Sequence, residues 1–214
     1  MPIDHPFAEH LHRFERAITL ARALDAPFIR IFSFYPPAAA MGAHAAATRS
    51  IDPSAYRDDV LSRLREMTAR ARAAGMTLLH ENEAGIYGDT IDRCVDLLRG
   101  IDDARLQATF DPANFIYGGQ VPFPDGYDAL RPWVRQVHVK DARPDGSVVP
   151  VGAGAGRWPD LLRRLRADGY DGFLALEPHL ALAGQYGGFS GPDLFRKASQ
   201  ALQQMLRAMD WAHG

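Results

Sequence analysis

The chain has little cysteine and no long apolar run. Its single cysteine, Cys94, lies in a helical apolar pattern with Ile91, Val95 and Leu98, so it forms no intrachain disulfide and is expected to be a small core residue. No stretch approaches the roughly 18 apolar residues of a membrane-spanning helix. Residues 1–17 contain neither the charged lead nor the apolar segment of a secretory signal. We therefore expect a cytoplasmic protein with no membrane partner.

The chain also lacks an excess of charge of either sign. Its 24 Lys and Arg residues and 26 Asp and Glu residues give a formal net charge of -2 at pH 7. Nucleic-acid-binding domains typically carry a basic surface, so the composition favours a small-molecule substrate and no nucleic acid partner. With 214 residues, 47% of them hydrophobic, the chain can form one substantial core. We expect a single domain over residues 1–214.

Helix and strand patterns alternate along the chain. Apolar residues at steps of three and four predict amphipathic helices, and short runs rich in β-branched and aromatic residues predict strands. Such alternation is typical of an α/β protein with a parallel sheet, either open and doubly wound or closed into a (β/α) barrel. Strands are expected at 26–34, 76–82, 105–111, 134–141 and 172–178, helices at 6–24, 52–75, 89–98, 158–169 and 191–209, a weak helical turn at 128–131, a loop or lid at 35–50 and a glycine-rich loop at 142–157.

The ends of four successive strands decide between these two folds. Glu81, Asp111, His138 and Glu177 each end a predicted strand, at intervals of 30, 27 and 39 residues. One βα unit takes roughly 30 residues, and the longest interval contains the glycine-rich loop. An open sheet gathers its ligand at one switch point, whereas a barrel brings the carboxyl ends of all its strands to one mouth. The pattern therefore favours a TIM-barrel-type sheet.

Three carboxylates and one imidazole at one mouth predict a divalent metal site. Without a cation, the carboxylates would repel one another and raise each other's pKa. Oxygen ligands with one nitrogen suit Mn²⁺, with Mg²⁺ or Co²⁺ as alternatives, and about two positions stay open for sugar oxygens. Such an ion would polarise a carbonyl and stabilise an ene-diolate. The structural alternatives are cap or turn roles for the three acids and a hydrogen-bonded core histidine.

At these residues the chain resembles the sugar phosphate isomerase/epimerase family with the xylose isomerase-like TIM barrel. The matching segments are LLHEN, FDPAN, VHVKD and GFLALEP, supported by APFIRIFSF and VPVGAGAGRWPDLLRRL, in the family's order over nearly the whole chain. In ketose 3-epimerases of this group the matching residues bind Mn²⁺ or a similar ion. The resemblance implies that Glu81, Asp111, His138 and Glu177 are metal ligands, and that Glu81 and Glu177 are also the catalytic proton-transfer pair.

The chain departs from that family in two respects. Relatives often carry Asp-x-x-His where this chain has Asp111-Pro-Ala-Asn114, and an amide binds a hydroxyl without transferring a proton. Relatives also have eight strands, whereas we expect about five βα units corresponding to strands 4–8, an N-terminally incomplete barrel. Its open edges at 28–34 and 172–178 predict either a homodimer across those edges or a chain of poor stability.

Five further residues are candidates for substrate binding. Lys140 shares the face of His138 and could hold a carboxylate, a phosphate or the ene-diolate, with a salt bridge to Asp141 as the alternative. The side chain of His80 is expected to point to the opposite face of the strand from Glu81 and to pack against a helix. The substrate-binding candidates are Lys140, Asn114, Arg30, Glu83 and His179, each with a loop, turn or ion-pair role as the alternative.

The glycines of the segment GAGAG, residues 152–156, have the spacing of a phosphate-binding loop. The segment lacks the Lys-Ser/Thr of a P-loop, however, and is more typical of a flexible turn that leads into the next helix.

Three functions stay open from the sequence. The first is a divalent-metal-dependent sugar or sugar phosphate isomerase/epimerase of carbohydrate metabolism. The second is a keto-inositol dehydratase, which would use the same metal and a carboxylate base. The third is a non-catalytic, degenerate barrel fragment that binds a polyol or a partner subunit and takes up no metal. An endonuclease IV-like hydrolase is disfavoured, because Asn114 replaces a histidine and the chain is not basic.

Overall fold

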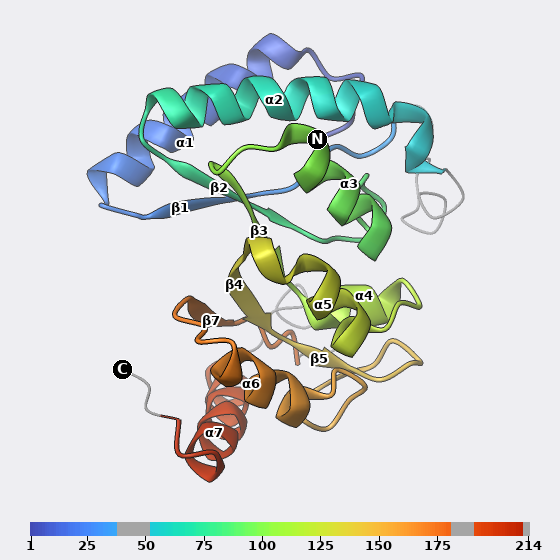
Figure 1. The fold of residues 1–214 in the computed structure, drawn as a ribbon, viewed down its shortest axis with the longest axis vertical. Helices are drawn as coiled ribbons and strands as arrows, with labels where there is room; N and C mark the ends of the chain where they lie inside the picture. Colours follow the sequence, from blue (N-terminus) through green and yellow to red (C-terminus); the bar gives the residue numbers. More distant parts are fainter. Residues whose placement is uncertain (38–51, 181–190, 212–214) are drawn as a thin grey trace. The chain divides into compact units, whose positions relative to one another are not determined.

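The computed structural model describes residues 1–37, 52–180 and 191–211. The chain divides into two compact units, Met1–Thr109 (unit 1) and Phe110–Gly214 (unit 2). Figure 1 follows them by colour, from blue at the start of unit 1 to red at the end of unit 2. The expectation of one domain over the whole chain stays a prediction. The expected loop or lid at 35–50 falls mostly outside the described residues.

Unit 1 is built on three parallel strands. Arg30 of the first strand is opposite Leu79 of the second, and Glu81 of the second is opposite Thr109 of the third. Because side chains alternate between the two faces of a sheet, Arg30 and Glu81 lie on the same face. The strands follow the order β1-β2-β3, with β1 at Phe28–Ile31, β2 at Thr77–Glu81 and β3 at Leu106–Phe110, whose last residue opens unit 2.

The helices of unit 1 cover these strands. Helix α2 (Arg57–Ala73) contacts both α1 (Phe7–Ala23) and α3 (Ile91–Ile101), and in Figure 1 α1 and α2 run along one side of β1 and β2. Its buried stripe, which includes Val60, Leu64 and Met67, has the helical spacing that the sequence predicts. The helical elements are α1 (Phe7–Ala23), η3 (Pro53–Tyr56), α2 (Arg57–Ala73) and α3 (Ile91–Ile101).

His80 is a core residue, as expected. Its side chain is 2% exposed and points away from the face of Glu81. A Cβ built on Gly88 would lie within 3.1 Å of both the His80 ring and Leu97 of α3, which shows how tightly this ring packs beside the helix. Burial lowers the pKa of His80 to about 4, against a smaller opposing effect of Glu81, so the ring is neutral at pH 7.

Unit 2 combines a parallel strand pair with a small antiparallel hairpin. His138 of β4 is opposite Ala175 of β7, and Asp141 of β5 is opposite Val149 of β6. The elements are α4 (Pro112–Tyr117), η4 (Pro122–Gly126), α5 (Tyr127–Leu130), η5 (Arg131–Trp133), β4 (Val134–Val139), β5 (Asp141–Ala142), β6 (Val148–Val149), α6 (Trp158–Ala167), β7 (Phe173–Leu176) and α7 (Pro192–Ala208).

The structure confirms the predicted α/β class and corrects two local predictions. The segment after the strand at 105–111, where the sequence predicted no helix before the weak turn at 128–131, begins with α4, because the Asp111 carboxylate accepts a hydrogen bond from the N–H of Asn114 and Pro112 starts the helix. The expected loop at 142–157 contains β6, which pairs back onto β5. Among the described residues, no helix is long and apolar enough to cross a membrane.

Candidate metal centre

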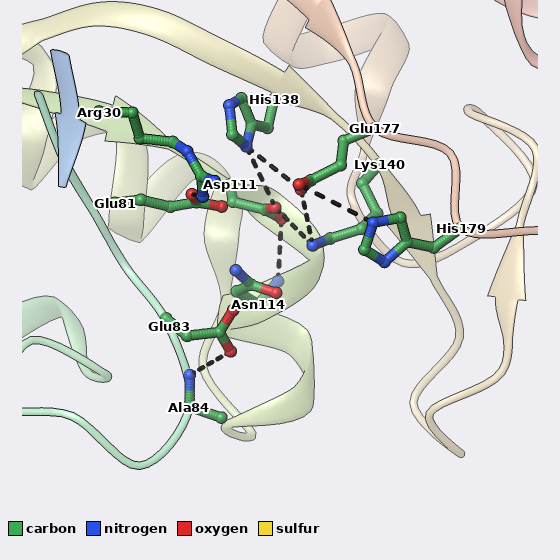
Figure 2. Close-up of polar contacts among 10 residues, drawn as sticks. All are labelled: Arg30, Glu81, Glu83, Ala84, Asp111, Asn114, His138, Lys140, Glu177 and His179. Atoms are coloured by element: carbon green, nitrogen blue, oxygen red, sulfur yellow. Dashed lines mark hydrogen bonds and ion pairs between the residues drawn. The ribbon is translucent and has the colours of Figure 1, made fainter. Parts of the chain in front are cut away.

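Three of the four predicted metal ligands converge within unit 2. Asp111 follows β3, His138 lies near the end of β4 and Glu177 follows β7. Each offers one ligand atom, and these atoms lie within 4.8 Å of one another. The Nδ1 atom of His138 is 3.2 Å from Oε2 of Glu177 and 3.9 Å from Oδ2 of Asp111. Figure 2 marks both contacts with dashed lines.

The separation of these atoms fits a divalent ion. Octahedral ligands at roughly 2.1–2.3 Å from an ion lie about 3.0–3.3 Å apart when adjacent and about 4.2–4.6 Å apart when opposite. The 3.2 Å separation between His138 and Glu177 matches adjacent ligands, and the 3.9 Å separation between His138 and Asp111 lies between the adjacent and opposite values. Two carboxylates and one imidazole also form the donor set of a hard or borderline ion rather than of a thiolate-preferring one. Asp111, His138 and Glu177 could therefore hold such an ion.

Lys140 supplies positive charge to this cluster. Its Nζ atom is 2.7 Å from Oδ2 of Asp111 and 3.2 Å from Oε2 of Glu177, and its side chain is 4% exposed (Figure 2). Burial disfavours the ammonium, but the two carboxylates outweigh burial and hold the pKa of Lys140 above its usual range. The alternative of a Lys140–Asp141 salt bridge is wrong, because the carboxylate of Asp141 binds backbone amides instead.

Glu177 is ionised at neutral pH although it is partly buried. Burial raises its pKa, but the hydrogen bond from His138 and the charge of Lys140 oppose burial and hold the pKa of Glu177 well below its usual range. An ionised carboxylate can both bind a cation and accept a proton. His179 lies near the other oxygen of this carboxylate, with its Nε2 atom 3.8 Å from Oε1 of Glu177.

Asp111 combines the two roles that the sequence left open. Its Oδ1 atom accepts from the N–H of Asn114 at 3.0 Å and so caps α4, while Oδ2 contacts Lys140. The cap fixes the orientation of the carboxylate. Because the helix uses only Oδ1, the other oxygen is left for the contact with Lys140. Asn114 is buried in the first turn of α4, at 4% exposure, and its contact with substrate stays a prediction.

In unit 1, Glu81 forms an ion pair with Arg30. Oε2 of Glu81, whose side chain is 1% exposed, accepts from Nη1 of Arg30. The Arg30 guanidinium also lies 4.7 Å from the centroid of the Phe32 ring. Glu83 binds locally, since its Oε1 accepts from the N–H of Ala84 at 2.7 Å (Figure 2). The structure shows the ion pair of Arg30 with a buried carboxylate, although the Arg30 side chain itself is exposed. Substrate contacts of Arg30 and Glu83 stay predictions.

The sequence reasoning missed Asp141. This residue is 1% exposed, and its carboxylate accepts four backbone hydrogen bonds, from Ala142, Gly152, Gly154 and Gly156, at 2.9–3.0 Å. Burial raises the pKa of Asp141, while the four donors oppose that rise. The available signal was an acid at a strand end, followed 11 residues later by glycines at every second position.

The parallel strands with their covering helices define a TIM-barrel-type α/β protein. The model of the xylose isomerase-like TIM barrel family matches residues 3–205. The chain belongs to this family, which confirms the resemblance and the fold class drawn from the sequence.

Solved structures with similar folds include a D-tagatose 3-epimerase-like protein, at a TM-score of 0.73 and 20% identity over 98% of this chain and 74% of that one. The probable 3-DHS dehydratase AsbF of petrobactin synthesis from Bacillus anthracis matches at 0.73 and 18% over 95% and 73%. A xylose isomerase-like TIM barrel protein from Mycobacterium smegmatis, in complex with magnesium, matches at 0.69 and 20% over 96% and 69%. These identities show the fold alone. A search of curated protein sequences finds no match.

Proposed function

We propose that this protein is a divalent-metal-dependent sugar or sugar phosphate isomerase/epimerase. The observation that carries the proposal is the convergence of Asp111, His138 and Glu177 beside the charged Lys140 in unit 2. The donor set favours Mn²⁺, with Mg²⁺ or Co²⁺ as alternatives. The epimerase-like protein and the magnesium complex among the similar structures agree with both parts of the proposal.

We further propose Glu81 as the fourth ligand. Glu81 is opposite Thr109 in the register of β2 and β3, and Asp111 is two residues further along the same chain. The family membership supports this role, because Glu81 ends one parallel strand and Asp111 follows the next one along the chain. The guanidinium of Arg30, which pairs with Oε2 of Glu81, would then leave the other carboxylate oxygen for the ion.

The two glutamates form the proposed proton-transfer pair. When bound, the ion would polarise the substrate carbonyl and stabilise the charge that develops on its oxygen. Glu177 accepts the proton from the adjacent carbon through Oε1, since Oε2 already contacts Lys140 and His138. Glu81, in its protonated form, donates a proton to the opposite face of the same carbon in an epimerisation, and proton exchange with water then restores the starting state of both glutamates; in an isomerisation the proton goes to the neighbouring carbon. The ammonium of Lys140 binds a substrate oxygen beside this carboxylate.

Metal analysis and proton exchange test this proposal. The purified protein is expected to contain a divalent ion, or to take up Mn²⁺, and then to exchange the carbon-bound proton of a ketose in D₂O. Glu177→Gln should lower the exchange rate by about 10²–10⁴-fold, the usual contribution of a general base. Glu66→Gln, at an exposed glutamate of α2 that pairs with Arg70, is the matched control and should exchange normally.

The outcome also separates the other two functions. Protein that binds no metal and shows no exchange after Mn²⁺ addition would sink the proposal and favour a degenerate barrel fragment. Metal-dependent loss of water from a keto-inositol, without exchange on ketoses, would instead identify a dehydratase.

A further inference from the structure

The Asp141 carboxylate fills the glycine loop that follows β4. Oδ1 accepts from the N–H groups of Ala142 and Gly156, and Oδ2 accepts from those of Gly152 and Gly154. These amides, three of them from alternate residues of the loop, converge on one centre, as successive amides do in the anion-binding nests that cradle phosphates in glycine-rich loops; we call this arrangement the nest. Here the anion in the nest is a side chain of the protein itself.

Two glycines of this loop, Gly154 and Gly156, are required by that carboxylate. A Cβ at Gly154 would lie 2.4 Å from both the backbone oxygen of Ala142 and Oδ1 of Asp141. A Cβ at Gly156 would lie 2.9 Å from the same carboxylate oxygen. The backbone therefore approaches Asp141 more closely than any residue with a side chain would allow. The glycine spacing that suggested a flexible turn is explained by this close approach.

The position of the loop gives the filled nest a consequence for substrate choice. TIM-barrel enzymes frequently bind a substrate phosphate with backbone amides of the loops after their last two strands. In this chain the loop after β4 leads into α6, and it begins next to Lys140, whose ammonium contacts Asp111 and Glu177. The amides that could bind a phosphate there already donate to Asp141.

We propose that Asp141 is an internal anion that occupies the phosphate position of this loop, so that the substrate of the metal centre carries no phosphate there. This inference rests on the proposed function, because it chooses between a sugar and a sugar phosphate as the substrate of that site. Of the two classes, it selects the unphosphorylated sugar.

The nest itself is tested without any substrate. Asp141→Ala removes the carboxylate, and its melting temperature should rise with formate, a probe of the size of the removed group, in a saturable way at constant ionic strength. The wild type and Asp145→Ala should not respond, because Asp145 is an exposed acid in the same hairpin. A folded Asp141→Ala protein that ignores formate, or a wild type with saturable stabilisation by inorganic phosphate, would overturn the inference.

The substrate class is tested on the wild-type protein, so this test does not depend on the folding of a variant. Proton exchange should proceed with a ketose at least about tenfold faster, in kcat/KM, than with its phosphate ester, since about one charge-assisted hydrogen bond accounts for such a factor. Exchange that prefers the phosphate ester and is competitively inhibited by inorganic phosphate refutes the inference but leaves the proposed function standing. Exchange with neither compound refutes the proposed function, and the formate experiment then decides on the nest alone.

Discussion

Replacement of Lys140 by methionine tests the electrostatics of the candidate metal centre most directly. The substitution keeps an unbranched apolar chain and removes the ammonium, with its charge and its hydrogen-bond donors, that lies 2.7 Å from Asp111 and 3.2 Å from Glu177. Asp111 is fully buried, so its carboxylate has little access to water once the ammonium is gone. Breaking a buried pair by removing one partner costs about 3–5 kcal/mol. At about 2–4 °C per kcal/mol for a chain of this size, the melting temperature should fall by about 5–20 °C.

The assay can be directed at unit 2. All three tryptophans of the chain, Trp133, Trp158 and Trp211, belong to this unit. Tryptophan fluorescence during denaturant unfolding therefore reports on the unit that contains Lys140, while far-UV circular dichroism reports on the whole chain. Lys197→Met, at an exposed position of α7, makes the same chemical change and should alter the free energy of unfolding by no more than about 0.5 kcal/mol.

Addition of Mn²⁺ gives the second half of this test. A divalent ion between the carboxylates supplies the charge that Lys140→Met removes, so the gap between variant and wild type should narrow when Mn²⁺ replaces EDTA. A loss below about 1 kcal/mol in EDTA would refute the electrostatic reasoning. A large loss that Mn²⁺ leaves unchanged would show that the ion does not bind between Asp111 and Glu177.

Three further predictions concern unit 1. Burial, and then the charges of the amino terminus and Arg63, lower the pKa of His10 to about 4; because the unfolded value is about 6.5, the free energy of unfolding should fall as pH drops from about 6.5 to 4. His10→Phe, which retains a ring beside Phe34, should reduce this slope in urea titrations, and equal slopes would contradict the assignment. Leu64→Ala, at a fully buried position, should lower the free energy of unfolding by about 2–5 kcal/mol, and a loss below about 1 kcal/mol would place it outside the core. Thr90→Ala removes the side-chain acceptor at the start of α3 and should cost about 0.5–2 kcal/mol by circular dichroism, so an unchanged midpoint would discount the cap.

Local periodicity predicted the helices well and the strand limits less well. The buried stripe of α2 follows directly from its three-four spacing, because one face of a single helix decides it. The strand expected at 26–34 is confined to Phe28–Ile31, where the register with β2 provides partners. A strand ends where its neighbour stops pairing, and that is a property of two segments rather than of one. The helix α4 was within reach of the sequence, since Asp111-Pro112 repeats the acid-proline start correctly read at Asp52-Pro53.

The candidate site was predictable where it depends on strand ends and unpredictable where it depends on partners. Asp111, His138 and Glu177 follow from the rule that parallel strands bring their carboxyl ends to one edge, and unit 2 confirms their convergence. The pairing of Lys140 with two of them was not predictable, because the adjacent Asp141 offered an equally plausible partner in the sequence. Asp141 does not pair with Lys140, because amides of the glycine loop donate hydrogen bonds to both of its carboxylate oxygens.

Neighbouring residues at the end of β4 have different roles. His138 and Lys140 are two residues apart and both reach the carboxylates of Asp111 and Glu177. The carboxylate of Asp141 instead accepts hydrogen bonds from four backbone amides of the glycine loop and its start. Because Asp141 is covalently next to Lys140, the hydrogen bonds that hold the loop also restrict the backbone from which the ammonium extends. The glycine loop, which carries no reactive group of its own, therefore helps to determine where the charge of the metal centre lies.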